Sequence, residues 1–249
     1  MFTTHCNHDP VLIGLSYLIS VLGSLSALQL AVAIPLARTA KDRWTSISLA
    51  GVAMGGGAIW SMHFIAMLAC RMDMAVAYDL WLTVASAVVG IVACMMGLAL
   101  AGRGGVFSFS RLAFAATIMG LGVASMHYSG MAAMVMPAKT VYAPGLVALS
   151  VVIGVLASAA ALWLAFHLRG VVQMLGSALV MGVAVCGMHY TGMAAASFVP
   201  NESGAMPASG PVVAGEQLGI GIFAITCGVL AVLYITNRMR ERQREALSI

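Results

Sequence analysis

Three copies of one short pattern bring together residue types that bind soft metal ions. In each copy a histidine follows a methionine, precedes an aromatic residue and has a second methionine four positions later. The histidines are His63, His127 and His189, spaced 64 and 62 residues apart. Imidazole and thioether together form a ligand set that suits copper. The repetition predicts one metal site to which all three copies contribute.

The spacing within each copy ranks the candidate ligands. Residues four apart lie on one face of a helix, so Met67, Met131 and Met193 can bind the same ion as the histidines before them. The methionines that precede the histidines point about 100° away, and filling the core is the usual role of methionine. They remain additional candidate ligands: Met62, Met126 and Met188.

Three further residues are candidates near the site. Tyr128 and Tyr190 follow two of the histidines and are candidates to orient a neighbouring imidazole, although packing is the commoner role of an aromatic side chain. His8 lies just before the first apolar segment and is a candidate ligand from the outer side. A terminal segment that binds metal only occasionally is the simpler interpretation of His8.

The composition places these motifs in a membrane. Hydrophobic residues make up 61% of the 249 residues and charged residues only 8%, against about 25% charged in an ordinary soluble domain. Continuous apolar runs favour helices over a membrane barrel, whose strands alternate. We therefore predict an all-α integral membrane protein with seven transmembrane helices. Their expected ranges are 11–37, 45–70, 80–101, 112–136, 145–167, 172–199 and 217–236.

Lysine and arginine predict the orientation. Cytoplasmic loops carry an excess of these residues, and placing the N-terminus outside puts ten inside and two, Arg71 and Lys139, outside. The net charge of +4 then reflects membrane orientation and does not indicate a nucleic-acid partner. The predicted division is an external N-terminus (1–10), a membrane domain (11–236) and a cytoplasmic tail (237–249). The ten inner residues are Arg38, Lys41, Arg43, Arg103, Arg111, Arg169, Arg238, Arg240, Arg242 and Arg244.

The motif positions predict a repeated architecture. The second, fourth and sixth expected helices each carry one motif near the outer end, so the fold is one leading helix plus three repeated helical hairpins. Parallel repeats of this kind are related by an axis along the membrane normal, which brings the motifs to one depth. A single buried histidine is commonly structural glue between helices, whereas three at matched depth favour a functional site.

The cysteines give weaker information. Cys94, Cys186 and Cys227 are expected to pack as small hydrophobic residues. Cys6 and Cys70 are both expected on the outer side, where a disulfide is one alternative. No cleavable signal peptide is evident at the N-terminus.

The motifs are specific enough to indicate a resemblance to a known family. Residues 57–67, the Met-His-Tyr blocks at 126–128 and 188–190, and the segments 8–12 and 24–28 are similar to the bacterial MHYT-domain family. The resemblance implies a seven-helix sensor of the bacterial cytoplasmic membrane that binds copper and detects a diatomic gas such as oxygen, carbon monoxide or nitric oxide. It also implies a cytoplasmic effector domain or partner. Phe64 and Ala66 depart from the Tyr and Gly of the other two copies.

Other functions fit the same residues less well. An intramembrane zinc hydrolase can use three histidines and a bound water, but all eight acidic residues lie in expected loops or termini. Heme held by histidine and methionine is a second alternative. Copper transport is a third, for which the methionines should continue as a ladder to the inner face. The preferred interpretation is a non-enzymatic sensor module with the lipid bilayer and a small gas as partners.

Overall fold

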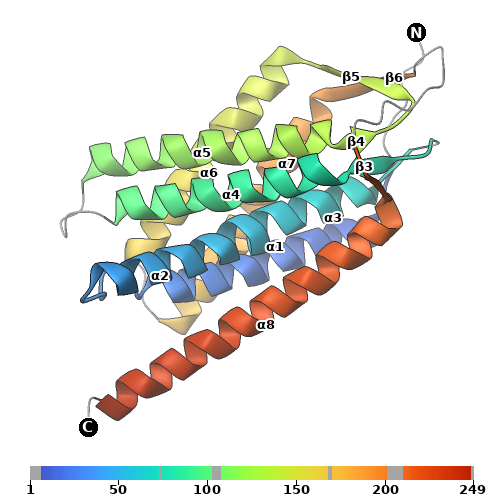
Figure 1. Cartoon of the computed structure of the whole chain (residues 1–249). Helices are drawn as coiled ribbons and strands as arrows, with labels where there is room; N and C mark the ends of the chain where they lie inside the picture. Colours follow the sequence, from blue (N-terminus) through green and yellow to red (C-terminus); the bar gives the residue numbers. More distant parts are fainter. Residues whose placement is uncertain (1–6, 73, 103–107, 168–169, 201–209, 248–249) are drawn as a thin grey trace.

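A computed structural model describes residues 7–72, 74–102, 108–167, 170–200 and 210–247, with side chains described up to 239. Within these ranges the chain forms a bundle of long helices with short strands at one end, where the N-terminus also lies (Figure 1). Seven helical spans in this part of the chain are long and apolar enough to cross a membrane, which confirms the predicted number. The helices are α1 (Pro10–Ala31), α2 (Ala40–Gly51), η1 (Val52–Trp60), α3 (Ser61–Ala69), α4 (Leu80–Ala101), α5 (Phe109–Ala132), α6 (Pro144–His167), α7 (Val171–Ala194) and α8 (Gly215–Leu247).

The second span differs from the other two motif spans because its middle part, η1, is a π-helix. Each motif span contains a Met-Gly pair before its histidine. Met119 and Met181 lie eight residues before their histidines, whereas Met54 lies nine residues before His63. All three methionines are buried. A π-helix places more residues in each turn than an α-helix. It therefore accommodates one extra residue while Met54 and His63 both stay inside the bundle.

Six of the spans close into a ring. In this ring η1 packs on α4, α4 on α5, α5 on α6, α6 on α7, α7 on α1, and α1 on η1 and α3. The helices approach closely at glycines: a Cβ at Gly55 would lie 2.5 Å from the carbonyl oxygen of Gly90, and one at Gly120 would lie 2.5 Å from Cα of Val155. Small residues allow such approach between membrane helices. The motif spans thus alternate with the returning helices.

The last helix, α8, lies outside this ring and runs obliquely along its surface (Figure 1). It packs on α1, η1 and α3. The hydroxyls of Ser61 and Thr226 are 2.6 Å apart at this interface, and Leu230 lies against Gly57. The leading helix α1 therefore takes the ring position between α7 and the second span.

Matching hydrogen bonds show the threefold repeat directly. The residue directly before each of α1, α4 and α6 donates its backbone N–H to the carbonyl of the residue that stands six positions after a motif histidine. The three bonds run from Asp9 to Ala69, from Asp79 to Ala133 and from Ala143 to Ala195, and each is 2.8 Å long. These bonds join each motif helix to the helix that precedes it, α1 to α3, α4 to α5 and α6 to α7, whereas the predicted hairpins paired each motif helix with the helix that follows it.

Short antiparallel strands cover the end of the bundle nearest the motifs. Three predicted spans extend too far, because α1 ends at Ala31, and α5 and α7 give way to strands soon after Ala132 and Ala194. The strands form three small sheets, with β1 on β2, β4 and β7 on either side of β3, and β5 on β6. Their bounds are β1 (Asn7–His8), β2 (Cys70–Arg71), β3 (Ala77–Asp79), β4 (Met134–Val135), β5 (Ala138–Tyr142), β6 (Ala196–Pro200) and β7 (Val212–Ala214).

The sheet of β1 and β2 attaches the N-terminal segment to the end of α3. Arg71 forms a salt bridge with Asp9, and the Asp9 carboxylate accepts hydrogen bonds from the backbone N–H groups of Val11 and Leu12. These backbone hydrogen bonds, assisted by Arg71, hold the pKa of the Asp9 carboxyl below its usual value. Cys70 is disulfide-bonded, and Cys6 lies outside the described residues. Cys94, Cys186 and Cys227 are free thiols.

The orientation predicted from lysine and arginine can be tested with reporter fusions. A reporter fused after Arg244 is expected to be cytoplasmic and one inserted in the 201–216 segment to be external, because arginine and lysine favour the cytoplasmic side. Residues 237–247 continue α8, so the predicted tail begins as helix. Paired alkaline phosphatase and fluorescent-protein fusions measure both sites. A cytoplasmic signal from the 201–216 segment would contradict the prediction.

Candidate metal centre

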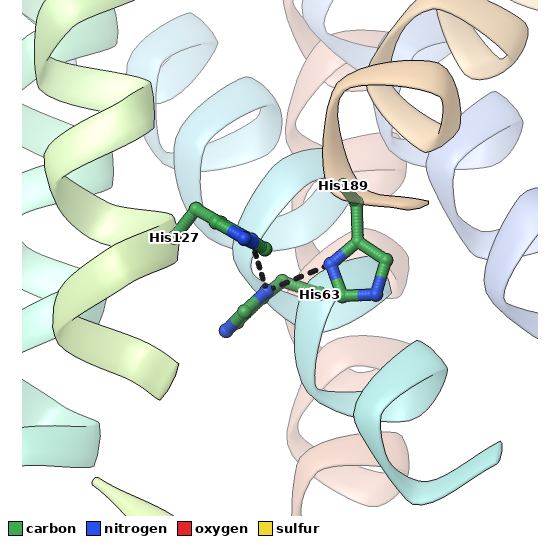
Figure 2. Close-up of side chains that lie close together, drawn as sticks. All are labelled: His63, His127 and His189. Carbon is green, nitrogen blue, oxygen red and sulfur yellow. Dashed lines mark hydrogen bonds between the residues drawn. The ribbon is translucent and has the colours of Figure 1, made fainter. Parts of the chain in front are cut away.

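The three motif histidines meet in the interior of the ring, as predicted. His63 comes from α3, His127 from α5 and His189 from α7, and their side chains point toward one another (Figure 2). One ring nitrogen of each lies within 4.8 Å of the other two. All three side chains are at most 1% exposed. Nitrogens bound about 2 Å from a shared ion are about 3–4 Å apart, so a small adjustment brings all three onto one metal.

The contacts at the centre cannot all be satisfied by hydrogen bonding. His63 Nδ1 lies 3.0 Å from Nδ1 of His189 and 3.1 Å from Nδ1 of His127. A neutral imidazole nitrogen carries either one proton or one lone pair. His63 Nδ1 therefore cannot form two full hydrogen bonds, whereas a cation at the centre can accept a lone pair from each ring.

The outer edge of each ring faces the protein. Nε2 of all three histidines is buried and has no hydrogen-bond partner among the described residues. Protonation at Nε2 leaves the Nδ1 lone pairs directed at the centre. The three rings thus obtain their polar contacts from one another or from whatever binds between them.

Two glycines make room for these edges. A Cβ at Gly130 would lie 2.3 Å from Nε2 of His63, and a Cβ at Gly192 would lie 2.3 Å from Nε2 of His127. Each glycine stands three residues after a motif histidine, so the imidazoles of His63 and His127 each lie against the helix that carries the next motif histidine. The contact of these glycines with the rings was not predicted from the sequence. In the first copy Ala66 stands at this position.

The methionines separate into two groups. Those four residues after the histidines, Met67, Met131 and Met193, are buried in one cluster at the strand end of the bundle. Those before the histidines pack toward the returning helices: Met126 lies against Gly90 of α4 and Met188 against Gly154 of α6. Met62 is also buried. The group predicted as primary ligands is therefore gathered together, while Met126 and Met188 fill helix interfaces.

One aromatic residue beside a histidine, Tyr128, is hydrogen-bonded to a serine of a returning helix. The Tyr128 hydroxyl is 2.7 Å from the Ser150 hydroxyl. Ser86 stands at the equivalent position, seven residues after Asp79 as Ser150 is after Ala143, and accepts a hydrogen bond of 3.1 Å from the Trp60 ring N–H. Tyr128 and Tyr190 make edge contacts with the rings of His127 and His189. They pack beside the imidazoles, and the serines were not singled out from the sequence.

His8 lies at the rim and outside the cluster. It is exposed on β1, and its ring makes an edge contact with Tyr190 at a centroid distance of 5.7 Å. Among the described residues, the group of possible metal-binding side chains consists of the three motif histidines and contains no carboxylate. Asp79 is buried but caps α4 by accepting a hydrogen bond from the backbone N–H of Leu82.

Comparison with known families finds one match that covers most of the chain. The MHYT family, described as a bacterial signalling protein N-terminal repeat, matches residues 56–115, 120–178 and 182–248. Each matched stretch begins seven residues before a motif histidine. No solved structure shows a significant match.

The similar curated proteins are larger signalling proteins. The bifunctional diguanylate cyclase/cyclic di-GMP phosphodiesterase MucR of Pseudomonas aeruginosa is 38% identical over 98% of this chain and 36% of its own length. The cyclic di-GMP phosphodiesterase NbdA of the same organism is 32% identical over 97% of this chain and 31% of its own. The signalling protein YkoW of Bacillus subtilis is 32% identical over 78% and 25%. The chain thus spans roughly a third or less of these relatives.

Proposed function

Because this chain belongs to the MHYT family of bacterial signalling proteins, we propose that it is a membrane-embedded sensor module whose three histidines bind a copper ion. The observation that carries the proposal is the convergence of three buried imidazole nitrogens, one from each repeat, on a single point. His63, His127 and His189 would hold the ion through Nδ1. Met67, Met131 and Met193, buried together at the strand end, would supply sulfur.

Copper fits this donor set better than the alternatives. Imidazole with thioether is a soft set that suits copper(I), whereas zinc has no special preference for thioether. A zinc hydrolase also needs a general base, and the histidine cluster contains no carboxylate among the described residues. Three imidazoles with nitrogens about 3 Å apart leave no width for a porphyrin between them, which favours a single ion over heme.

The signal would be a small diatomic gas or a change in redox state. Copper bound by neutral ligands supplies a site that such a molecule can coordinate. The ligand signals only if it binds one arrangement of the helices more tightly than another, and the cluster joins three helices that belong to one ring. With the N-terminus outside, the cytoplasmic end of α8 would pass the change to an effector, as the cyclic di-GMP enzymes named among the relatives suggest.

The metal content and the role of sulfur are tested together. Purified protein is expected to contain copper, and Met131→Leu, which keeps the apolar volume, is expected to weaken or remove the sulfur shell in X-ray absorption at the copper edge. Met96→Leu is the matched control, because Met96 is 47% exposed on α4. Stoichiometric zinc or a heme absorption band would refute the copper assignment. An unchanged sulfur shell in Met131→Leu would remove this methionine from the ligand set.

A further inference from the structure

A small cavity lies on the axis of the ring, on the side of the histidines away from the strands. Three of its lining residues, Ile59, Val123 and Val185, stand four positions, about one helical turn, before the three histidines, and Met188 directly precedes His189. Its volume is about 20 Å³. The other lining residues are Ser24, Met54, Met119, Gly154, Ala157, Ser158, Ala161, Met181, Ala184 and Met188.

The walls come from every motif span. Met54, Met119 and Met181 are the equivalent methionines of the three Met-Gly pairs, and they line the cavity together. Helices α1 and α6 contribute the remaining wall. An occupant of this cavity would therefore touch η1, α5 and α7 at once, and would sense any change in how these three helices pack.

One polar group in the wall lacks a partner. The Ser24 hydroxyl is buried, with 1% of the side chain exposed, and has no hydrogen-bond partner among the described residues. An unsatisfied buried hydroxyl costs about 1–3 kcal/mol, so a hydrogen bond to an occupant would offset this cost. Ser24 and Ser158 are the hydroxyl side chains of the lining, and every other side chain there is apolar.

The volume of the cavity and the chemistry of its lining residues determine which kind of molecule can bind there. A cavity holds a water molecule when it exceeds roughly 10–15 Å³ and offers two to four polar partners. This cavity has the size for one small molecule but is poor in polar partners. A cation would meet no negative charge among the lining residues. A small uncharged molecule with weak hydrogen-bonding capacity fits both the size and the walls.

We propose that this axial cavity is a binding pocket for one uncharged molecule of diatomic size, such as dioxygen, nitric oxide or carbon monoxide. The pocket is distinct from the metal centre, because none of the three histidines lines it. Ser24 is the hydrogen-bond donor of the pocket. The role of this pocket in gas signalling rests on the proposed function. The binding of the gas to the pocket does not depend on it.

Dioxygen itself is the probe, used on the full chain after removal of metal with a chelator. Methionine methyl groups labelled with ¹³C report paramagnetic relaxation by dissolved dioxygen. The methyl groups of Met54, Met181 and Met188 are expected to relax severalfold faster under dioxygen than that of Met126, which is equally buried but does not line the cavity. Equal relaxation at Met126 and Met181 would overturn the proposal, as would no effect at Met181.

A cavity-narrowing variant gives the second measurement. A Cβ at Gly154 would meet Met188 Cγ and the Gly120 carbonyl oxygen at 3.5 Å each, which is ordinary contact, so Gly154→Ala narrows the wall without a clash. It is expected to reduce the dioxygen effect at Met181 severalfold. Gly145→Ala on the same helix has nothing within 4 Å and is the control. Because the protein is metal-free, the absence of copper from the native protein would refute the proposed function and leave this result unchanged.

Discussion

Copper binding is expected to be lost when His63 is replaced by alanine. His63 Nδ1 is the one that contacts both of the other Nδ1 atoms, so its removal takes away the shared partner of the cluster. The loss in affinity should exceed the roughly 10–100-fold that changes in residues supporting a metal ligand cause. Metal content per protein after purification, with a competitive copper(I) chelator for the residual affinity, measures it.

The matched control for this variant is His167→Ala. His167 lies at the end of α6, is exposed and stacks on Trp163, so its loss should leave the copper content unchanged. His127→Ala and His189→Ala should resemble His63→Ala, because ligands that share one ion are not energetically independent. Full copper content in the His63→Ala variant would show that the three histidines are hydrogen-bonded side chains and do not bind the metal.

The second large effect on copper binding is expected when a glycine beside an imidazole is replaced by alanine, which adds one methyl group. Gly130→Ala would place Cβ 2.3 Å from Nε2 of His63, and Gly192→Ala would place it 2.3 Å from Nε2 of His127. Each ring is buried between packed helices, so it can yield only by leaving the centre. Either variant should lower copper affinity by a large factor and also lower thermal stability, since overpacking a core typically costs about 1–3 kcal/mol.

Gly187→Ala separates this effect from a general cost of alanine. Gly187 lies on the same helix as Gly192, two residues before His189, and nothing lies within 4 Å of the position of its Cβ. It should retain copper and gain a little helix stability. Copper titration and thermal unfolding followed by circular dichroism compare the three variants. Wild-type affinity in both Gly130→Ala and Gly192→Ala would show that the imidazole edges are not held by these helices.

The sequence was sufficient for the number of spans and for the meeting of the histidines. Long apolar runs identify membrane helices because the bilayer sets their length, and repeats at constant spacing place His63, His127 and His189 at one depth. The ends of the spans were less predictable. Strands β4 and β6 begin where apolar residues continue, so hydrophobicity alone could not distinguish the last turns of a helix from a short strand.

Other features depend on packing that one sequence does not reveal. The π-helix η1 is visible only after Met54 is aligned with Met119 and Met181, and the structure supplies that alignment by burying all three. We predicted α1 as an added leading helix, because each predicted hairpin begins with a motif helix, and the structure instead gives α1 a place in the ring between α7 and the second span. The directions of the His63 and His127 imidazoles depend on Gly130 and Gly192 of the neighbouring helices, which lie more than 60 residues away in the sequence.

The ring of six spans closes without α8, whose span is the least buried of the seven among the described residues. All three histidines and every residue that lines the axial cavity belong to the ring. Sequence beyond α8 can therefore be exchanged or lengthened without rebuilding the centre. Such independence suits a module that forms part of longer proteins, as in relatives in which the matched part makes up 25–36% of the length.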